Sequence, residues 1–290
     1  MKEWLEATRP RTLPVSCAGV IAGTACALLH GAFAWPQALI CLLFALIAQI
    51  VSNFANEYYD FKNGLDRKGR EGFRRGVTEG DIRPETMKHA MFALLALDCL
   101  LGCSLIYWGG WWLIPVGVAI AVFALAYSTG PWPLSHHGLG DVAVIIFFGI
   151  VPVWFTAWLQ AGSMAVSDDA LKMGVGVGLL AANVLIVNNY RDMEDDRAVG
   201  KHTTVVLLGR RVMSTVYLIF GLVGVGLVMW VFWPVLPKAA VFAAAFFAAV
   251  YIDLWWKITH RKGKQLNPLL GKTALTLMAV TICTLILALI

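Results

Sequence analysis

Apolar runs of about 20 residues recur along the whole chain, and each is long enough for a helix to cross the hydrocarbon core of a bilayer. They leave no room for a separate soluble domain. Hydrophobic residues make up 59% and charged residues 14% of the 290 residues, whereas a soluble domain carries about 25% charged residues. The sequence therefore predicts an all-α membrane protein with a single transmembrane domain over residues 1–290.

Hydropathy divides the chain into nine predicted spans. The tail before them, MKEWLEATRPRTLP, has acidic residues and two prolines, and we do not expect it to be a cleaved signal. The predicted spans are residues 12–30, 36–58, 86–108, 111–128, 139–160, 170–189, 212–232, 237–256 and 268–290.

Positive charge is distributed unevenly between the two ends of these spans. Of the 23 lysines and arginines, all but Lys172 and Lys238 fall in the N-terminal tail or in the connections after even-numbered spans. The positive-inside rule then predicts a multi-pass protein of the inner or plasma membrane, with the N-terminus and the long charged loops in the cytoplasm. The net charge of +5 thus indicates topology, and we expect no nucleic-acid partner.

One short motif occurs twice. Asn56 and Asp60 are four residues apart, and Asn188 and Asp192 repeat this spacing 132 residues later. The pairs end the second and sixth predicted spans, so both point the same way through the membrane, as in parallel repeats. Residues four apart share a helix face, and we expect the two motifs to face each other across a central cavity.

Further carboxyl groups extend both motifs. Asp196 lies one turn past Asp192, while Asp66 follows Gly64, where the helix can end and let the chain turn back. We therefore expect four carboxylates to converge, with two amide side chains beside them: Asp60, Asp66, Asp192, Asp196, Asn56 and Asn188.

Clustered carboxylates need cations to remain ionised. Oxygen ligands suit Mg²⁺, and no His or Cys stands at ligand spacing in these segments, which argues against zinc. Solvated helix caps are the alternative interpretation of either loop alone, but the repeated spacing favours a site. Nearby cations that could bind a diphosphate are Arg70, Arg74, Arg75, Arg191 and Lys201.

A third polar stretch, AYSTGPWPLSHHGLGDV, covers residues 126–142 on the same predicted face. Its glycine and prolines break the helix, after which Asp141 enters an apolar span. An ionisable residue there is costly and by default functional. We interpret His136 and His137 as loop residues rather than metal ligands.

These stretches resemble the UbiA superfamily of intramembrane aromatic prenyltransferases. The resemblance rests on RPRTLPVS (9–16), NEYYDFKNGLD (56–66), GPWPLSHHGLGD (130–141) and NNYRDMEDDRAVGKHT (188–203). The five-residue gap between Asp60 and Asp66 and the GLGD stretch are more similar to the 1,4-dihydroxy-2-naphthoate branch than to the 4-hydroxybenzoate branch. The chain departs from the superfamily in having Gly72-Phe73-Arg74-Arg75 where a Gly-Pro-x-Arg is expected.

The resemblance implies nine helices around a cavity open to the bilayer. It also implies Mg²⁺ held by both Asp motifs, and transfer of a polyprenyl chain from its diphosphate to a naphthoate that loses its carboxyl group. The allylic cation of such a reaction favours electron-rich aromatic faces, and Asp141 is a candidate for orienting the acceptor or taking its proton. Tyrosines near the motifs are Tyr58, Tyr59, Tyr127 and Tyr190.

Two other functions remain open from the sequence. An enzyme of the same superfamily could use another aromatic acceptor, such as 4-hydroxybenzoate. A polytopic transporter with duplicated halves is an alternative from a different class, but it predicts acidic residues near the bilayer midplane. Here the motif carboxylates stand at helix ends beside basic loops.

Overall fold

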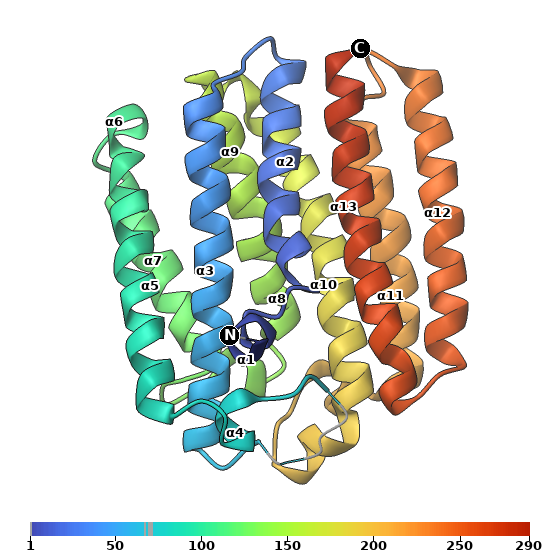
Figure 1. Cartoon of the computed structure of the whole chain (residues 1–290). Helices are drawn as coiled ribbons and strands as arrows, with labels where there is room; N and C mark the ends of the chain where they lie inside the picture. The colour runs from blue at the N-terminus through green and yellow to red at the C-terminus, as the bar shows by residue number, and fades with distance from the viewer. Residues whose placement is uncertain (1, 67, 69–71) are drawn as a thin grey trace.

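The computed structural model describes residues 2–66, 68 and 72–290, and within these residues it contains helices and no strands. Long helices stand side by side, and the chain ends at the upper end of the bundle in Figure 1. The elements are α1 (Lys2–Ala7), α2 (Leu13–Leu29), α3 (Trp35–Lys62), α4 (Gly76–Glu79), α5 (Pro84–Ser104), α6 (Ile106–Gly109), α7 (Leu113–Ala126), η1 (Leu134–His136), α8 (Gly140–Val144), η2 (Ile145–Ile150), α9 (Val151–Ala161), η3 (Met164–Val166), α10 (Ser167–Ala198), α11 (Thr204–Trp230), α12 (Pro237–Thr259), η4 (Gly263–Leu266) and α13 (Asn267–Leu289).

The described residues contain seven helical stretches long and apolar enough to cross a membrane, which confirms a multi-pass helical fold. Two shorter apolar helices, α2 and α7, occupy the remaining predicted spans. At 1.5 Å per residue, the 14 residues of α7 cover about 21 Å, less than the hydrocarbon core of about 30 Å. The count of nine spans therefore stays a prediction.

The span that begins at Gly140 contains an irregular stretch where it meets α10. Its middle segment η2 is a π-helix of six residues, a rare form that is frequent at functional sites. A Cβ atom on Gly149 would come within 2.3 Å of the backbone of Gly174 and Gly178 in α10. Only glycine permits this backbone contact, which holds η2 against the helix that carries the second Asp motif.

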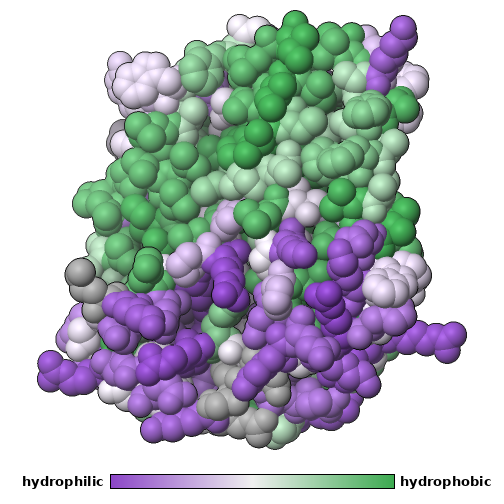
Figure 2. Space-filling model, turned by 45° about the vertical axis from the view of Figure 1, so that its right-hand side comes forward, coloured by the Kyte–Doolittle hydropathy of each residue, from purple (hydrophilic) through white to green (hydrophobic). Residues whose placement is uncertain are grey.

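Polar and apolar surface are separated along the bundle axis. Figure 2 shows hydrophilic residues gathered over the lower end and hydrophobic residues over most of the rest of this face. Both α3 and α10 run to the lower end, where α4 and the charged connections lie (Figure 1). The two Asp motifs thus stand at the same end of the molecule, as parallel repeats require.

Candidate active site

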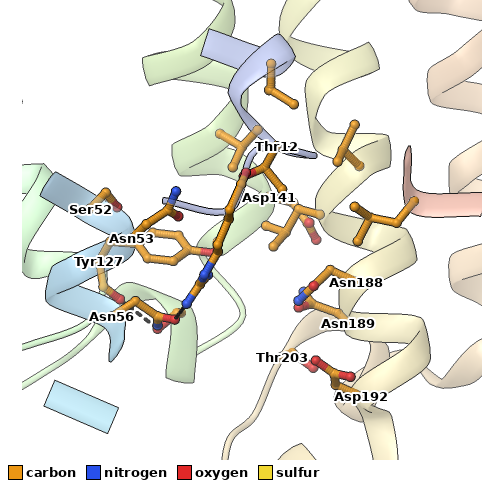
Figure 3. A pocket seen from close by; sticks show the side chains of 18 of the residues that line it. Thr12, Ser52, Asn53, Asn56, Tyr127, Asp141, Asn188, Asn189, Asp192 and Thr203 are labelled. Atoms are coloured by element: carbon orange, nitrogen blue, oxygen red, sulfur yellow. Dashed lines mark hydrogen bonds between the residues drawn. The ribbon is translucent and has the colours of Figure 1, made fainter. Parts of the chain in front are cut away.

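A cavity of about 180 Å³ opens between α3 and α10 at the charged end. Polar side chains from both helices face it in Figure 3, with Asn56 on one wall and Asn188 and Asp192 on the other. Its lining includes ten of the predicted site residues: Asn56, Asp60, Arg75, Tyr127, Asp141, Asn188, Arg191, Asp192, Asp196 and Lys201.

The first motif ends α3 in the manner predicted from Gly64. The N–H of Gly64 (φ +68°) donates to the Phe61 carbonyl at 3.0 Å, and the N–H of Leu65 donates to the Asp60 carbonyl at 2.8 Å. These two bonds form a Schellman motif, which ends the helix and reverses the chain. Asp66 is thereby brought back beside Arg75, with 3.3 Å between its Oδ2 and the Arg75 Nε.

Asp60 is the centre of charge at this helix end. Its side chain is 1% exposed, and Oδ2 lies 2.9 Å from Lys201 Nζ and 3.8 Å from Arg75 Nη2. Asn56 Nδ2 donates to the same oxygen at 3.3 Å. The other oxygen, Oδ1, is buried and accepts no hydrogen bond from a described residue.

His136 approaches Asp60 from the loop before α8, with its Nε2 at 4.0 Å from Asp60 Oδ1. Burial lowers the pKa of this imidazole, and the Lys201 ammonium lowers it further. An imidazole with a lowered pKa is neutral at pH 7. The positive charges around Asp60 therefore belong to Lys201 and Arg75.

The second motif is neutralised by its own neighbour. Arg191 grips both oxygens of Asp192, with Nε to Oδ1 at 2.7 Å and Nη2 to Oδ2 at 2.8 Å. The same guanidinium donates to Asn188 Oδ1 at 2.8 Å and lies over the Phe73 ring, 5.2 Å from its centroid. A bidentate pair of this kind is both strong and fixed in orientation.

The end of α10 has the same Schellman motif, but there it lies one helical turn further past the Asn-x3-Asp motif than in α3. The N–H of Gly200 (φ +74°) donates to Arg197 at 3.2 Å, and the N–H of Lys201 donates to Asp196 at 2.8 Å. Lys201 thus leaves α10 at the point that Leu65 occupies after α3. From there its ammonium reaches Asp60 on the opposite helix.

Three of the four predicted carboxylates, those of Asp60, Asp192 and Asp196, line this one cavity. No three Asp, Glu, His or Cys side chains among the described residues are close enough to hold one metal ion together. Basic side chains instead balance the carboxylates at each helix end: Lys201 and Arg75 at Asp60, and Arg191 at Asp192. The all-oxygen donor set and the unmatched Asp60 Oδ1 fit Mg²⁺, provided that ligand oxygens complete the coordination.

Three of the four predicted tyrosines do not face this cavity. Only Tyr127 lines it, whereas Tyr58 and Tyr59 pack edge to face with ring centroids 5.0 Å apart. Tyr190 lies under the Arg210 guanidinium, 5.6 Å away. Tyr58 and Tyr190 each follow the motif asparagine by two residues, which is about 200° around the helix and turns them away from this cavity; a substrate contact for them stays a prediction.

Of the predicted arginines in the loop after α3, one lines the cavity and another does not. Arg75 is 7% exposed and lines the cavity, where its Nη2 donates to Asn56 Oδ1 at 2.8 Å. The Arg74 side chain is 47% exposed, pairs with Asp81 and Glu6, and does not line the cavity, so its substrate contact stays a prediction. Arg70 lies outside the described residues.

Asp141 stands on the cavity wall between the two motifs (Figure 3). The Thr204 hydroxyl donates to its Oδ2 at 2.5 Å, while its Oδ1 is buried and accepts no hydrogen bond from a described residue. One carboxylate oxygen is thus fixed by the protein and the other is available to a ligand.

Arg9 is a cavity residue to which the sequence analysis gave no role. Its Nη2 donates to Asn56 Oδ1 at 2.5 Å, so Asn56 holds two guanidinium groups, those of Arg9 and Arg75. Arg9 has a φ of +52°, the one positive value among the described residues other than glycine. Such backbone strain clusters at ligand sites, and the RPRTLP stretch was the available signal.

A second, apolar chamber of about 480 Å³ adjoins the first cavity. Its walls come mainly from α2, α3, α5, α7 and the η2–α9 segment, and its lining is dominated by Leu, Ile, Val, Ala and Phe side chains. Five residues line both spaces and mark their boundary: Gln49, Ser52, Tyr127, Val144 and Phe148.

A charged cavity thus adjoins an apolar chamber inside a bundle of helices long and apolar enough to cross a membrane. The chain belongs to the UbiA prenyltransferase family, whose model matches residues 16–287.

Relatives and a solved structure agree with this membership. The chain is 39% identical over 215 residues to the 1,4-dihydroxy-2-naphthoate octaprenyltransferase of Escherichia coli, covering 71% of this chain and 68% of that protein. It is 38% identical to the enzyme of that name from Mycobacterium tuberculosis, covering 71% and 70%. The fold matches a UbiA homolog from Archaeoglobus fulgidus bound to GPP and Mg²⁺, with a TM-score of 0.67 at 16% identity over 98% and 99% of the two chains.

Proposed function

We propose that this protein is a Mg²⁺-dependent prenyltransferase that moves a polyprenyl group from its diphosphate to 1,4-dihydroxy-2-naphthoate, with loss of CO₂. The observation that carries the proposal is the pair of equivalent helix ends, each with Asp and Asn side chains, facing one cavity that continues into an apolar chamber. The names of the relatives support the naphthoate as acceptor.

The diphosphate head is assigned to the charged cavity. Asp60 and Asp66 on one side, and Asp192 and Asp196 on the other, would hold Mg²⁺, which when bound draws charge from the leaving diphosphate. Lys201, Arg75 and Arg191 would donate to its remaining oxygens. The ion pairs of these residues would then exchange protein carboxylates for phosphate oxygens, and the cavity would keep its charge balance.

The polyprenyl tail is assigned to the apolar chamber. Its volume of about 480 Å³ and its largely hydrocarbon lining suit a chain that carries no polar group. The allylic carbon would then lie at the boundary between the two spaces, where Tyr127 presents an aromatic ring. Exclusion of water there protects the allylic cation, and a cation–π contact contributes about 0.5–2 kcal/mol.

The acceptor reaction can be written in balanced form. The allylic C–O bond breaks and its electron pair leaves with the diphosphate, while a ring π pair forms the new C–C bond at the carbon bearing the carboxylate. The hydroxyl group on the neighbouring carbon gives up its proton as that carbon becomes a carbonyl. Loss of CO₂ returns an electron pair to the ring, and the oxygen regains a proton.

The proton of this sequence must leave the hydroxyl oxygen and come back to it. Asp141 is our candidate for the group that accepts it, because Oδ1 is unmatched while Thr204 fixes Oδ2. Net transfer of a proton to solvent is not required, which suits a buried carboxyl group.

The test uses membranes containing the protein, a labelled polyprenyl diphosphate and a panel of aromatic acceptors. We expect a product whose mass equals acceptor plus prenyl group, less one hydrogen and CO₂, and labelled CO₂ from carboxyl-labelled naphthoate. A product that keeps its carboxyl group, or a preference for 4-hydroxybenzoate, would assign the protein to another branch of the family. Ion-coupled transport without transfer would support the transporter instead.

We also propose one domain over residues 1–290, in the inner or plasma membrane, with both Asp motifs in the cytoplasm. The support is the location of all but two lysines and arginines on the same predicted side. Reporters fused after Gly80 and after Arg211 should both read cytoplasmic. Opposite readings would exclude a site shared by the two motifs.

A further inference from the structure

Hydrogen-bond acceptors without a donor are a feature of the two cavities that the prenyl donor does not explain. Asp141 Oδ1 in the charged cavity, Gln49 Oε1 at the boundary and Asp98 Oδ1 in the apolar chamber are buried and accept no hydrogen bond from a described residue. Leaving such a group unmatched costs about 1–3 kcal/mol. A polyprenyl diphosphate offers acceptor oxygens and C–H groups, so the matching O–H groups belong to the second substrate.

The orientation of the Gln49 amide is set by a chain of hydrogen bonds that begins at the backbone. The Thr8 carbonyl can only accept, and Asn53 Nδ2 donates to it at 3.0 Å. Asn53 therefore presents its Oδ1 to Gln49, whose Nε2 donates to it at 3.1 Å. Gln49 must then direct Oε1 away from Asn53, as an acceptor that the chain of bonds leaves unused.

Gln49 stands at the level where the two substrates would react. It precedes Asn56 by seven residues on α3, which places it two turns, about 10 Å, from the motif along the helix axis. It lines the charged cavity and the apolar chamber alike. Among the three unmatched acceptors it is the one at the boundary, where the head of the donor would end and its tail begin.

The naphthoate acceptor has hydroxyl groups on opposite sides of one ring. The 1-hydroxyl adjoins the carboxylate and the reacting carbon, and the proposed function assigns its proton to Asp141. The negative carboxylate of the acceptor would face the basic side chains of the charged cavity, and the 4-hydroxyl would then point away from them.

We infer that Gln49 accepts a hydrogen bond from this 4-hydroxyl and so selects a 1,4-dihydroxy acceptor over a monohydroxy one. The inference rests on the proposed function and deepens it: Gln49 Oε1 is a specificity determinant of the acceptor site, and Asn53 is the residue that positions it. The neutral amide suits a hydroxyl that keeps its proton during the reaction, whereas Asp141 serves the hydroxyl that loses it.

The experiment pairs two substrates with a set of variants. The acceptors are 1,4-dihydroxy-2-naphthoate and 1-hydroxy-2-naphthoate, which differ only in the 4-hydroxyl, and kcat/KM is measured for each. Wild-type protein should prefer the dihydroxy acceptor by about tenfold, the value of one hydrogen bond to a buried acceptor. Gln49→Leu should reduce the ratio to near one and leave KM for the prenyl diphosphate unchanged.

Four further variants test whether the effect belongs to Gln49. Ser52→Ala changes another boundary residue and should keep the wild-type ratio of kcat/KM between the two acceptors. Asp141→Asn should slow the reaction with both acceptors and should also keep this ratio. Gln49→Met matches the shape of glutamine more closely than leucine does and should also remove the preference for the dihydroxy acceptor. It takes the place of Gln49→Leu if that variant does not fold. An unchanged ratio in the Gln49 variants, or loss of the ratio in Asp141→Asn or Asp98→Leu instead, overturns the inference. If wild-type protein prenylates neither naphthoate, the proposed function fails first.

Discussion

The ends of α3 and α10 carry the same Asn-x3-Asp motif and the same Schellman ending, yet they neutralise their aspartates differently. Asp192 is held by Arg191, the residue before it in the chain, through two bonds of 2.7 and 2.8 Å. Asp60 is held by Lys201, which is 141 residues away, and by Arg75 from the loop after α3. The α10 end is thus complete within one half of the repeat, whereas the α3 end is complete only when both halves meet.

This difference bears on how the site works. A pair formed by neighbours on one helix is present wherever that helix forms. A pair between the two halves exists only if the cavity has its native width. The Lys201–Asp60 ion pair therefore depends on the distance between the two motifs, whereas the Arg191–Asp192 ion pair does not.

The largest expected effect comes from removing either motif aspartate. Asp60→Asn and Asp192→Asn should each lower prenyl transfer by at least about a hundredfold, because each removes a carboxylate that would hold the Mg²⁺ bound to the diphosphate. EDTA should silence wild-type protein and added Mg²⁺ restore it. Turnover that persists in EDTA would exclude the metal assignment.

The same two variants should differ in stability. The Arg191 side chain is 2% exposed, and an uncompensated buried charge costs about 3–5 kcal/mol. Lys201 is less buried, at 11%, and can turn its ammonium toward water. Thermal unfolding in detergent should therefore show a larger loss for Asp192→Asn than for Asp60→Asn; equal losses would contradict the contrast drawn between the two ends.

The next effect concerns the cation that crosses the cavity. Lys201→Met should lower transfer about tenfold to a hundredfold, the range of a hydrogen bond to a charged group. It should also weaken inhibition by pyrophosphate, because both depend on the diphosphate site. A change confined to KM for the aromatic acceptor would assign Lys201 to the other substrate.

A smaller and more selective effect is expected from adjacent arginines. Arg75→Gln should reduce transfer about tenfold, since its buried guanidinium reaches Asp60, Asp66 and Asn56. Arg74→Gln removes the same charge one residue earlier and should stay within about twofold, because exposed ion pairs contribute about 0–1 kcal/mol. Similar losses in both variants would indicate a general charge effect rather than a contact with substrate.

The sequence predicted those parts of the molecule that depend on short-range periodicity. Apolar runs located the long helices, and a spacing of four residues placed Asn56 and Asp60 on one face. Gly64 predicted the chain reversal that places Asp66 beside Arg75, because glycine is the residue that most readily adopts the positive φ, here +68°, that ends a helix in this way.

Contacts between distant segments had no such signal. Nothing near Asp60 in the sequence indicates Lys201, and nothing distinguishes Arg75 from Arg74 until the loop after α3 is folded. The spacing of the carboxylates across the cavity had no such signal either, because the distance between the helix ends depends on how the two halves pack. The orientation of the Gln49 amide likewise depends on a carbonyl at Thr8, 41 residues earlier.

The smallest expected effect tests whether the two Schellman endings are equivalent. Gly64 and Gly200 have φ values of +68° and +74°, and a Cβ atom at either position would meet nothing within 4 Å. Alanine should therefore cost only backbone strain, about 1 kcal/mol at each site, and asparagine less, because it tolerates this conformation. The thermal midpoints of Gly64→Ala and Gly200→Ala should fall by similar amounts. Their effects on transfer should differ in kind: Gly64→Ala misplaces Asp66 and should raise the Mg²⁺ concentration needed for half-maximal rate, whereas Gly200→Ala misplaces Lys201 and should weaken pyrophosphate inhibition. If both variants changed the same parameter, the two helix ends would not have the separate roles that their different partners indicate.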